Sequence, residues 1–193
     1  MYVDLATLKA ALGITDSDRD VLLSQAIEAA SASIDERCGR TFGRDEEPSP
    51  RVFSVRGRVV RQEDCTHLLM IDDVADLDGF KVETGGPDDW TEITGYETAP
   101  DNAIARGRPV TGLVRPFWSS VGKVRVTAVW GWPEVPAQIV QATLLQASRL
   151  YRRKDSPEGV AGSAEWGLVR VPSLDPDVRA LVEPFRLTGF GGA

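Results

Sequence analysis

The sequence has few of the side chains that usually build catalytic or metal sites. Its 193 residues include only two cysteines, Cys38 and Cys65, and a single histidine, His67. Two cysteines in a chain without a signal-peptide pattern predict reduced thiols rather than a disulfide framework. Cys65 and His67 fall short of the four ligands of a structural zinc site, and no third group orients them as a catalytic pair. We therefore predict no metal, no cofactor and no enzymatic activity.

Long apolar runs and an excess of basic charge are also missing. No run approaches the length of a membrane span, and Asp4 and Lys9 interrupt the start of the chain, where a signal peptide would lie. We therefore expect no membrane partner and a cytoplasmic location by default. The formal net charge of −7 argues against a protein that grips nucleic acid over a broad basic face.

A DNA contact in such an acidic chain needs a local basic cluster. The one candidate lies at the end of a predicted helix, where basic side chains could touch phosphates or an acidic partner. Its alternative, which we favour, is capping of the helix and pairing with acidic neighbours. The cluster consists of Arg149, Arg152, Arg153 and Lys154.

Ligand-binding loops with a known spacing are absent as well. No glycine-rich run has the spacing of a phosphate-binding loop, and there is no Gly-x-Ser-x-Gly nucleophile motif. The acidic run at residues 72–79 does not fit a calcium loop, because Val74 and Gly85 take the places of the first and twelfth ligands. We interpret this run as a solvated turn between strands.

Apolar spacing and capping residues predict four helices. Leu5, Leu8 and Leu12 recur at helical spacing between Asp4, a capping residue, and Gly13. Asp175 and Pro176 give the last helix a cap and a proline in its first turn. The expected helices span about residues 5–12, 16–38, 136–154 and 175–183. Their expected packing residues are Leu23, Ile27, Ile34, Ile139, Leu144 and Leu150.

The middle of the chain alternates in the manner of β-strands. Val124, Val126, Ala128 and Trp130 share one face of the clearest run. The intervals between the runs are too short for parallel crossovers, so the pattern predicts an antiparallel meander. The expected strands are residues 51–60, 66–71, 80–84, 90–93, 102–105 and 121–130.

These elements predict an α+β fold with two parts. A small helical bundle core comprises residues 1–45 and 134–193 and ends in a flexible tail. An antiparallel β-rich insertion comprises residues 50–133.

Three segments together resemble a known family. They are residues 2–14 (YVDLATLKAALGI), residues 124–154, which contain the turn WGWPEVP before a helix, and residues 154–162. In combination they resemble the head-tail connector (adaptor) proteins of long-tailed double-stranded-DNA bacteriophages. The resemblance covers about residues 1–42 and 122–187, and the middle of the chain resembles the variable β-rich insertion of longer members.

The resemblance implies a structural protein of the virion neck, assembled in the host cytoplasm. Such a protein forms a ring between the portal protein and a tail-side head-completion or tail-terminator protein. Its subunits pack helices side by side around a channel, as a dodecamer that matches the portal. DNA passes through that channel without sequence-specific binding.

The resemblance also implies that the C-terminal segment reaches the portal. We expect docking through exposed apolar and basic side chains, and we expect residues 184–193 to be unneeded for the core. The candidate docking residues are Trp166, Leu181, Phe185, Arg186, Leu187 and Phe190.

A different class of function stays open at this point. The β region could be a standalone module that presents Trp90 and Trp118 to a carbohydrate or a protein, since aromatic faces make good binding platforms. Independent folding of residues 50–133 would favour the module, and their unfolding without the helices would favour an insertion.

Overall fold

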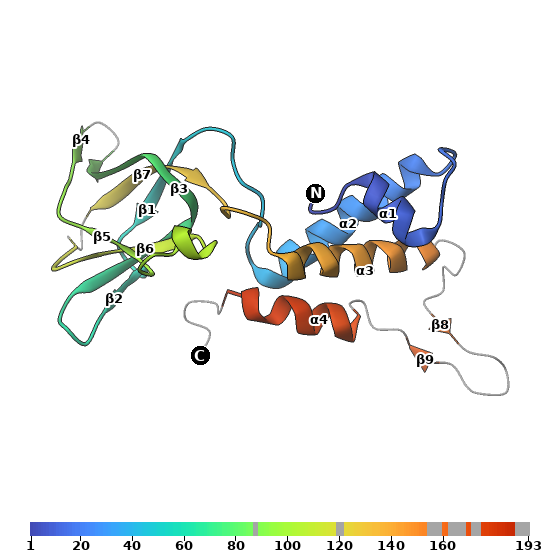
Figure 1. The fold of residues 1–193 in the computed structure, drawn as a ribbon. Helices are drawn as coiled ribbons and strands as arrows, with labels where there is room; N and C mark the ends of the chain where they lie inside the picture. The colour runs from blue at the N-terminus through green and yellow to red at the C-terminus, as the bar shows by residue number, and fades with distance from the viewer. Residues whose placement is uncertain (87–88, 119–121, 154–159, 162–168, 171–174, 188–193) are drawn as a thin grey trace. The chain divides into compact units, whose positions relative to one another are not determined.

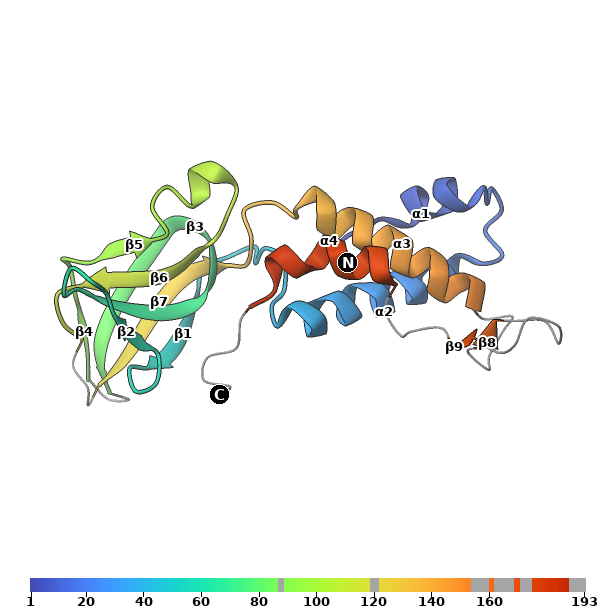
Figure 2. The same ribbon diagram turned by 90° about the horizontal axis from the view of Figure 1, so that it is seen from below.

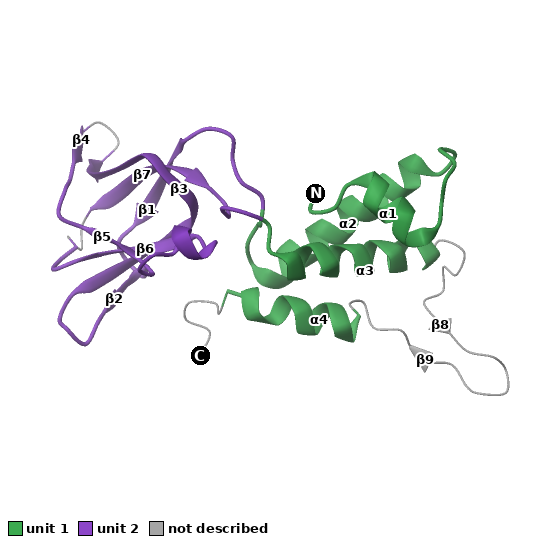
Figure 3. Cartoon of the chain, viewed as in Figure 1, with its two compact units in different colours: residues 1–42, 135–188 green, residues 43–134, 189–193 purple. Residues whose placement is uncertain are grey.

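The computed structural model describes residues 1–86, 89–118, 122–153, 160–161, 169–170 and 175–187 (Figure 1). The chain divides into two compact units (Figure 3). The helical unit comprises Met1–Phe42 and Val135–Thr188, and the described part of the β unit is Gly43–Glu134. The predicted α+β class is confirmed.

The helical unit contains the four expected helices, whose bounds differ slightly from the predicted ones. The Asp4 carboxylate caps the first helix by accepting a hydrogen bond from the Thr7 N–H at 2.6 Å. The second helix begins later than the expected residue 16, because the Asp16 carboxylate accepts from the Asp18 N–H at 3.2 Å in a turn outside the helix. The helices are α1 (Leu5–Leu12), α2 (Asp20–Cys38), α3 (Ala137–Arg153) and α4 (Pro176–Val182), and the 3-10 helix η2 (Glu183–Phe185) follows α4.

Apolar side chains from these helices form the core of the helical unit. Helix α3 packs against α2 and α4, and α1 contacts α2 and α3 (Figures 1 and 2). Leu23, Ile27, Ile34 and Ile139 are all fully buried, as their spacing predicted. The two other expected packing residues, Leu144 and Leu150, are half-buried against the same core.

The β unit is a seven-stranded antiparallel sheet in which one strand is the hub. Strand β3 pairs with β2 and β6 along its first half and with β7 and β4 along its second half. Strand β1 pairs with β7, and β5 pairs with β6. The strands are β1 (Ser49–Ser54), β2 (Val59–Arg61), β3 (His67–Gly86), β4 (Asp89–Glu92), β5 (Glu97–Ala99), β6 (Val110–Arg115) and β7 (Lys123–Trp130).

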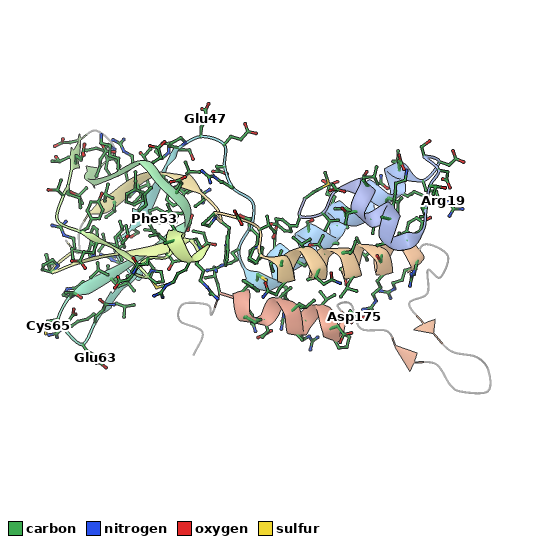
Figure 4. All side chains as sticks on the ribbon, in the orientation of Figure 1. Arg19, Glu47, Phe53, Glu63, Cys65 and Asp175 are labelled. Carbon is green, nitrogen blue, oxygen red and sulfur yellow. The ribbon has the colours of Figure 1, made fainter. Side chains whose placement is uncertain are left out.

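The predicted alternation in β7 is confirmed. Val124, Val126, Ala128 and Trp130 are at most 1% exposed and belong to the core of the β unit. Phe53 of β1, labelled in Figure 4, lies in the same core. Its ring centroid is 5.8 Å from that of Trp130.

The acidic run at residues 72–79 is part of β3, so its interpretation as a turn between strands is wrong. Its aspartates have specific partners on other segments: the Asp72 carboxylate lies 3.1 Å from the Arg51 guanidinium, and that of Asp76 lies 2.7 Å from Arg44. The pairing register shifts between residues 74 and 81, where the Asp76 side chain accepts from the Asp78 N–H. The turn-forming residues therefore distort the strand without ending it.

Further strand predictions differ from the structure. The strand expected at residues 51–60 is divided into β1 and β2 by a turn at residues 55–58. Residues 102–105 were expected as a strand, but Ile104–Arg106 form a 3-10 helix, η1, after Asn102, whose φ is 57°. Strand β6 was not predicted, because Gly112 interrupts its pattern. A Cβ at residue 112 would lie 2.4 Å from a Leu68 methyl carbon on β3, so a larger residue there would require the Leu68 side chain to shift.

The two chain segments that bound the β unit are hydrogen-bonded to each other. The Asp45 N–H donates to the Trp130 carbonyl at 2.8 Å, and the Trp132 N–H donates to the Gly43 carbonyl at 3.2 Å. Gly131 lies between them with φ 109°, and a Cβ there would lie 1.8 Å from the Gly43 carbonyl oxygen. We call these paired segments, residues 43–45 and 130–132, the joint.

A short pair of strands, β8 (Val160–Ala161) and β9 (Val169–Arg170), follows α3. Among the described helices, none combines the length and the apolar character that a membrane crossing requires.

Candidate functional site

The C-terminal segment, where portal docking was expected, packs partly into the helical core. Phe185 is 8% exposed, and its ring meets the Phe42 ring edge-on with 5.8 Å between centroids. The Leu187 N–H donates to the Cys38 carbonyl at 2.8 Å. Phe185 is therefore a core residue, and the expectation that residues 184–193 are unneeded for the core is wrong.

The other candidate docking residues differ in accessibility. Leu181 is half-buried, whereas Arg186 is exposed and Leu187 is 42% exposed. The Arg186 guanidinium lies 3.6 Å from the Glu183 carboxylate one turn earlier. Trp166 and Phe190 lie outside the described residues. The accessible docking candidates in the described chain are thus Arg186 and Leu187.

A polar group that the sequence did not predict ties the first residues to α2 near this segment. The Tyr2 hydroxyl donates to an Asp35 carboxylate oxygen at 2.6 Å and accepts from the Phe42 N–H at 2.8 Å. Burial raises the pKa of both Tyr2 and Asp35, and the bond between them keeps the Tyr2 hydroxyl protonated. In the sequence, Tyr2 precedes the Asp4 cap and belongs to no periodic pattern. Its contact with Asp35 could therefore not be predicted from the sequence.

Cys38 lies next to this group and is chemically quiet. Burial, with the nearby Asp35 carboxylate second, raises the pKa of the Cys38 thiol to about 11. The thiol is 3.8 Å from the Val182 carbonyl oxygen. A protonated, enclosed thiol is a poor nucleophile, so Cys38 acts in packing.

The basic cluster at the end of α3 is partly neutralised. The Arg149 guanidinium lies 3.4 Å from the carboxylate of Asp175, the residue that caps α4 and is labelled in Figure 4. Arg152 is exposed and Arg153 is half-buried, whereas Lys154 lies outside the described residues. Arg149 therefore pairs with an acidic neighbour, which is the alternative that the sequence favoured.

Helix α2 carries apolar and small side chains on an exposed face. Val21 is 71% and Leu22 is 47% exposed, although both are aliphatic. About two and three turns further along, Ala29 and Ala32 are exposed as well. We call Val21, Leu22, Ala29 and Ala32 the α2 face.

The tryptophans of the β unit do not form an open platform for a sugar. Trp118 is 3% exposed, and its indole N–H donates to the His67 carbonyl at 3.0 Å. The Trp90 ring is covered by the Arg125 guanidinium, 4.6 Å from its centroid. These contacts give both residues structural roles, which removes the main support for a carbohydrate-binding module.

The Arg125 guanidinium that covers Trp90 also belongs to a charged cluster across three strands. It contacts both carboxylate oxygens of Glu83, at 2.6 and 2.7 Å. The Lys81 ammonium lies 3.0 Å from the same carboxylate and 3.6 Å from that of Glu92. Hydrogen bonds from Arg125 and then Lys81 lower the pKa of Glu83 to about 2.

Cys65 and His67 each contact a different part of the chain. The Cys65 sulfur accepts from Arg61 at 3.3 Å in the turn before β3, where Figure 4 labels it near Glu63. His67 Nδ1 lies 2.7 Å from the Pro116 carbonyl oxygen. In the described part of the chain, no three histidine, cysteine or acidic side chains gather as metal ligands would.

Comparison with known proteins gives one family and one fold. Residues 2–60 match the family of phage gp6-like head-tail connector proteins. A chain in the neck of an empty gene transfer agent (GTA) particle, computed with C6 symmetry, is 19% identical with a TM-score of 0.56. A chain in the virion of the native GTA particle is also 19% identical, with a TM-score of 0.57. No curated protein gives a significant match.

Each of these two alignments covers 100% of this chain and 93% of the other chain, so the similarity includes both units. At such an identity the likeness establishes a shared fold. The family match covers the first of the three segments that carry the sequence resemblance, residues 2–14, and the other two, within residues 124–162, lie beyond it. The predicted resemblance is confirmed: the chain resembles the phage gp6-like head-tail connectors, which are structural rather than enzymatic proteins.

Proposed function

We propose that this chain is a structural subunit of a virion neck. In this proposal it forms a ring between the portal protein and a tail-side head-completion or tail-terminator protein. The observation that carries the proposal is the full-length likeness to a chain from a GTA neck, joined to the connector match over residues 2–60. That neck was computed with C6 symmetry, which favours a ring, and a dodecamer is compatible with sixfold symmetry.

The α2 face is the proposed contact between neighbouring subunits. Val21 and Leu22 supply apolar area, and the small Ala29 and Ala32 allow the backbone of a neighbouring helix to approach closely. Leu145 on α3, which is 39% exposed, supplies a further apolar side chain. Side-by-side packing of helices in a ring would remove these groups from water.

The charge of the chain suits a channel that DNA passes without being held. The formal net charge is −7, and Arg149 of the basic cluster is paired with Asp175. Acidic side chains repel phosphates, so a wall of this composition does not trap the duplex. Arg152, Arg153 and Lys154 are then the only members of that cluster proposed to touch DNA or an acidic partner.

The two units take different parts in this proposal. Residues 1–45 and 134–193 would be the connector core, and residues 50–133 would be an insertion in it. Portal docking would use Arg186 and Leu187, with Leu181, Trp166 and Phe190 as further contacts, whereas Phe185 holds the segment to the core.

Sedimentation velocity tests the ring. The full chain is measured alone and mixed with the portal protein encoded beside it, at micromolar concentrations. A complex with several copies of the chain per portal is expected. Two well-folded proteins that sediment separately would contradict the proposal.

A pair of variants tests the α2 face in the same assay. Val21→Asp should weaken the assembly, because it places a charge in the proposed subunit contact. Val60→Asp is the matched control, since Val60 is a 39% exposed valine of the β unit. Equal assembly by the two variants would exclude the α2 face as the contact.

Docking is tested with changes that spare Phe185. Arg186→Glu and a chain that ends at residue 187 should both keep a native circular-dichroism spectrum and bind the portal more weakly. Unchanged portal affinity in both, with native spectra, would remove this segment from the docking surface.

A further inference from the structure

The β unit contains a small pocket between the end of β6 and the start of β7. Its volume is about 180 Å³. The lining includes Val55, Arg115, Phe117, Trp118, Lys123 and Val124. No part of the proposed ring function uses this pocket, so an inference about it goes beyond that function.

The floor of the pocket is apolar and fixed. Val55, Trp118 and Val124 are each at most 6% exposed. The indole of Trp118 is held by its bond to the His67 carbonyl. Phe117, by contrast, is 64% exposed and contacts the His67 ring edge-on, 6.2 Å between centroids. The pocket thus has a rigid apolar floor, and the accessible apolar group beside it is the Phe117 ring.

Two cations face this apolar surface without an acidic partner. The Arg115 guanidinium lies over the Trp118 ring, 5.1 Å from its centroid. Its Nε is buried, and no described residue accepts a hydrogen bond from it. Lys123 is exposed and has no ion pair within the described ranges. Elsewhere in the β unit Arg44, Arg51 and Arg125 all pair with carboxylates.

The Arg115 side chain is half-buried at the pocket and has no ion pair with the described residues, so its charge has no carboxylate partner there. A guanidinium over an indole and an ammonium nearby favour a carboxylate or a phosphate oxygen. The apolar floor adds a second requirement, because the anion must carry an apolar group next to it.

We propose that this pocket binds an acidic segment of a partner protein, with an Asp or Glu carboxylate on Arg115 and Lys123 and a neighbouring apolar side chain on Phe117. A protein partner fits better than DNA for two reasons. The chain carries a formal net charge of −7, which repels a polyanion as a whole. The apolar floor also gives nothing to a phosphate backbone.

A nuclear magnetic resonance titration of the full-length chain tests the proposal. The probe is N-acetyl-glutamyl-leucine amide, and the signals followed are the Arg115 Nε–H and the Trp118 indole N–H. We expect both signals to move and to saturate with a dissociation constant on the order of millimolar, as for a ligand of this size. The matched probe with glutamine in place of glutamate should bind about tenfold more weakly, because it lacks the charge.

Two variants locate the effect. Lys123→Gln should weaken binding of the glutamyl probe several-fold, while its exposed position leaves the fold unchanged. Arg108→Gln is the matched control: it removes one exposed positive charge at the opposite end of β6, and it should bind as the unchanged chain does.

Three outcomes would overturn the proposal. Equal shifts with the glutamyl and glutaminyl probes would exclude an anion site. A stronger response to a DNA duplex than to the glutamyl probe would assign the pocket to nucleic acid. An equal loss of binding in Lys123→Gln and Arg108→Gln would mean that the response reports only overall charge. Failure of portal binding in the assays above has no bearing on these measurements.

Discussion

In the helical unit, helices begin at capping residues that lie next to them in the chain. In the β unit, strands are joined by contacts between residues that lie far apart in the chain. Asp4 caps α1 through Thr7, and Asp175 caps α4 through Asp177. In the β unit the Glu83–Arg125 pair spans 42 positions, and the Trp130 indole reaches the Ser49 carbonyl across 81 positions. Local contacts form without closing a long loop of chain. The two units should therefore lose stability to different kinds of substitution.

The two units also differ in where they place charge. In the β unit, the Glu83–Arg125 ion pair joins β3 to β7 and includes the side chain of Glu83, a residue that is 5% exposed. The helical unit leaves its most exposed aliphatic side chains, Val21 and Leu22, on one helix. In the proposed ring, these exposed side chains of α2 would be the apolar area that neighbouring subunits cover.

The largest loss of stability is expected at the joint. Gly131→Ala requires a positive φ of an alanine and drives its Cβ into the Gly43 carbonyl, so we expect a loss of about 4 kcal/mol in the β unit. Urea denaturation followed by tryptophan fluorescence measures it, since four of the five tryptophans lie in this unit. The control is Gly57→Ala, where φ is 79° but nothing lies within 4 Å of the new Cβ; we expect about 1 kcal/mol. Equal losses would show that the close approach is not limiting.

A core truncation should weaken the helical unit by a similar or slightly smaller amount. Phe185→Ala removes a ring packed on Phe42, and we expect a loss of about 3 kcal/mol. Circular dichroism at the helical minimum measures it during urea denaturation. Leu187→Ala, at a residue 42% exposed, should cost less than about 1 kcal/mol. A loss at Phe185 no larger than at Leu187 would contradict a core role for the ring.

Acid should lower the stability of the β unit more than that of the helical unit. The pKa of Glu83 is lowered from 4.5 to about 2 in the folded protein, so its ionised form stabilises the β unit above pH 4.5 and that contribution disappears as the pH falls toward 2. The pKa of Asp35 in the helical unit is raised instead, so its protonation on acidification favours folding of that unit and opposes the effect of Asp4, whose pKa the Thr7 N–H lowers. Between pH 5 and pH 3 the urea midpoint by fluorescence should therefore fall more than the midpoint by circular dichroism.

Glu83→Gln should make the fluorescence midpoint less sensitive to pH over that range, because glutamine does not titrate. An unchanged pH dependence in this variant would assign the acid sensitivity to other carboxylates, of which Asp64 and Asp76 also have lowered pKa values.

The smallest effect is expected at a helix cap. Asp4→Ala removes the acceptor of the Thr7 N–H and should cost about 1 kcal/mol in the helical unit. Asp4→Asn keeps a side-chain oxygen at the cap, so it should cost clearly less. Equal losses in thermal denaturation would mean that charge, rather than the hydrogen bond, matters at this position.

The same contrast explains what the sequence could predict. Helix α1 was predicted with its bounds, because Asp4, the leucine spacing and Gly13 all lie within the element. The start of α2 was missed by four residues, since Asp16 closes a turn whose residues also suit a cap. Through its acidic run β3 stays paired with β6 and β7, whose residues lie more than thirty positions later. No local pattern could have supplied those partners.

The candidate interaction surfaces followed the same division. Phe185 is buried against Phe42, which lies far away in the sequence. The sequence therefore predicted an exposed tail where the structure has a core contact. The pairing of Arg149 with an acidic neighbour was anticipated, although the identity of Asp175 was not. The pocket at Arg115 was missed entirely, because Val55, Arg115 and Lys123 come together only through strand pairing.

The joint gives the chain a property useful to an engineer. Because residues 43–45 and 130–132 are hydrogen-bonded side by side, the backbone leaves the helices and returns to them at one place. An insertion whose two ends already lie side by side can be shortened or exchanged at little entropic cost to the remaining chain. The stretch between Gly43 and Trp132 is therefore a natural cassette, where a tag, a fluorescent protein or a foreign binding domain could be spliced in while α2 and α3 keep their own loop ends.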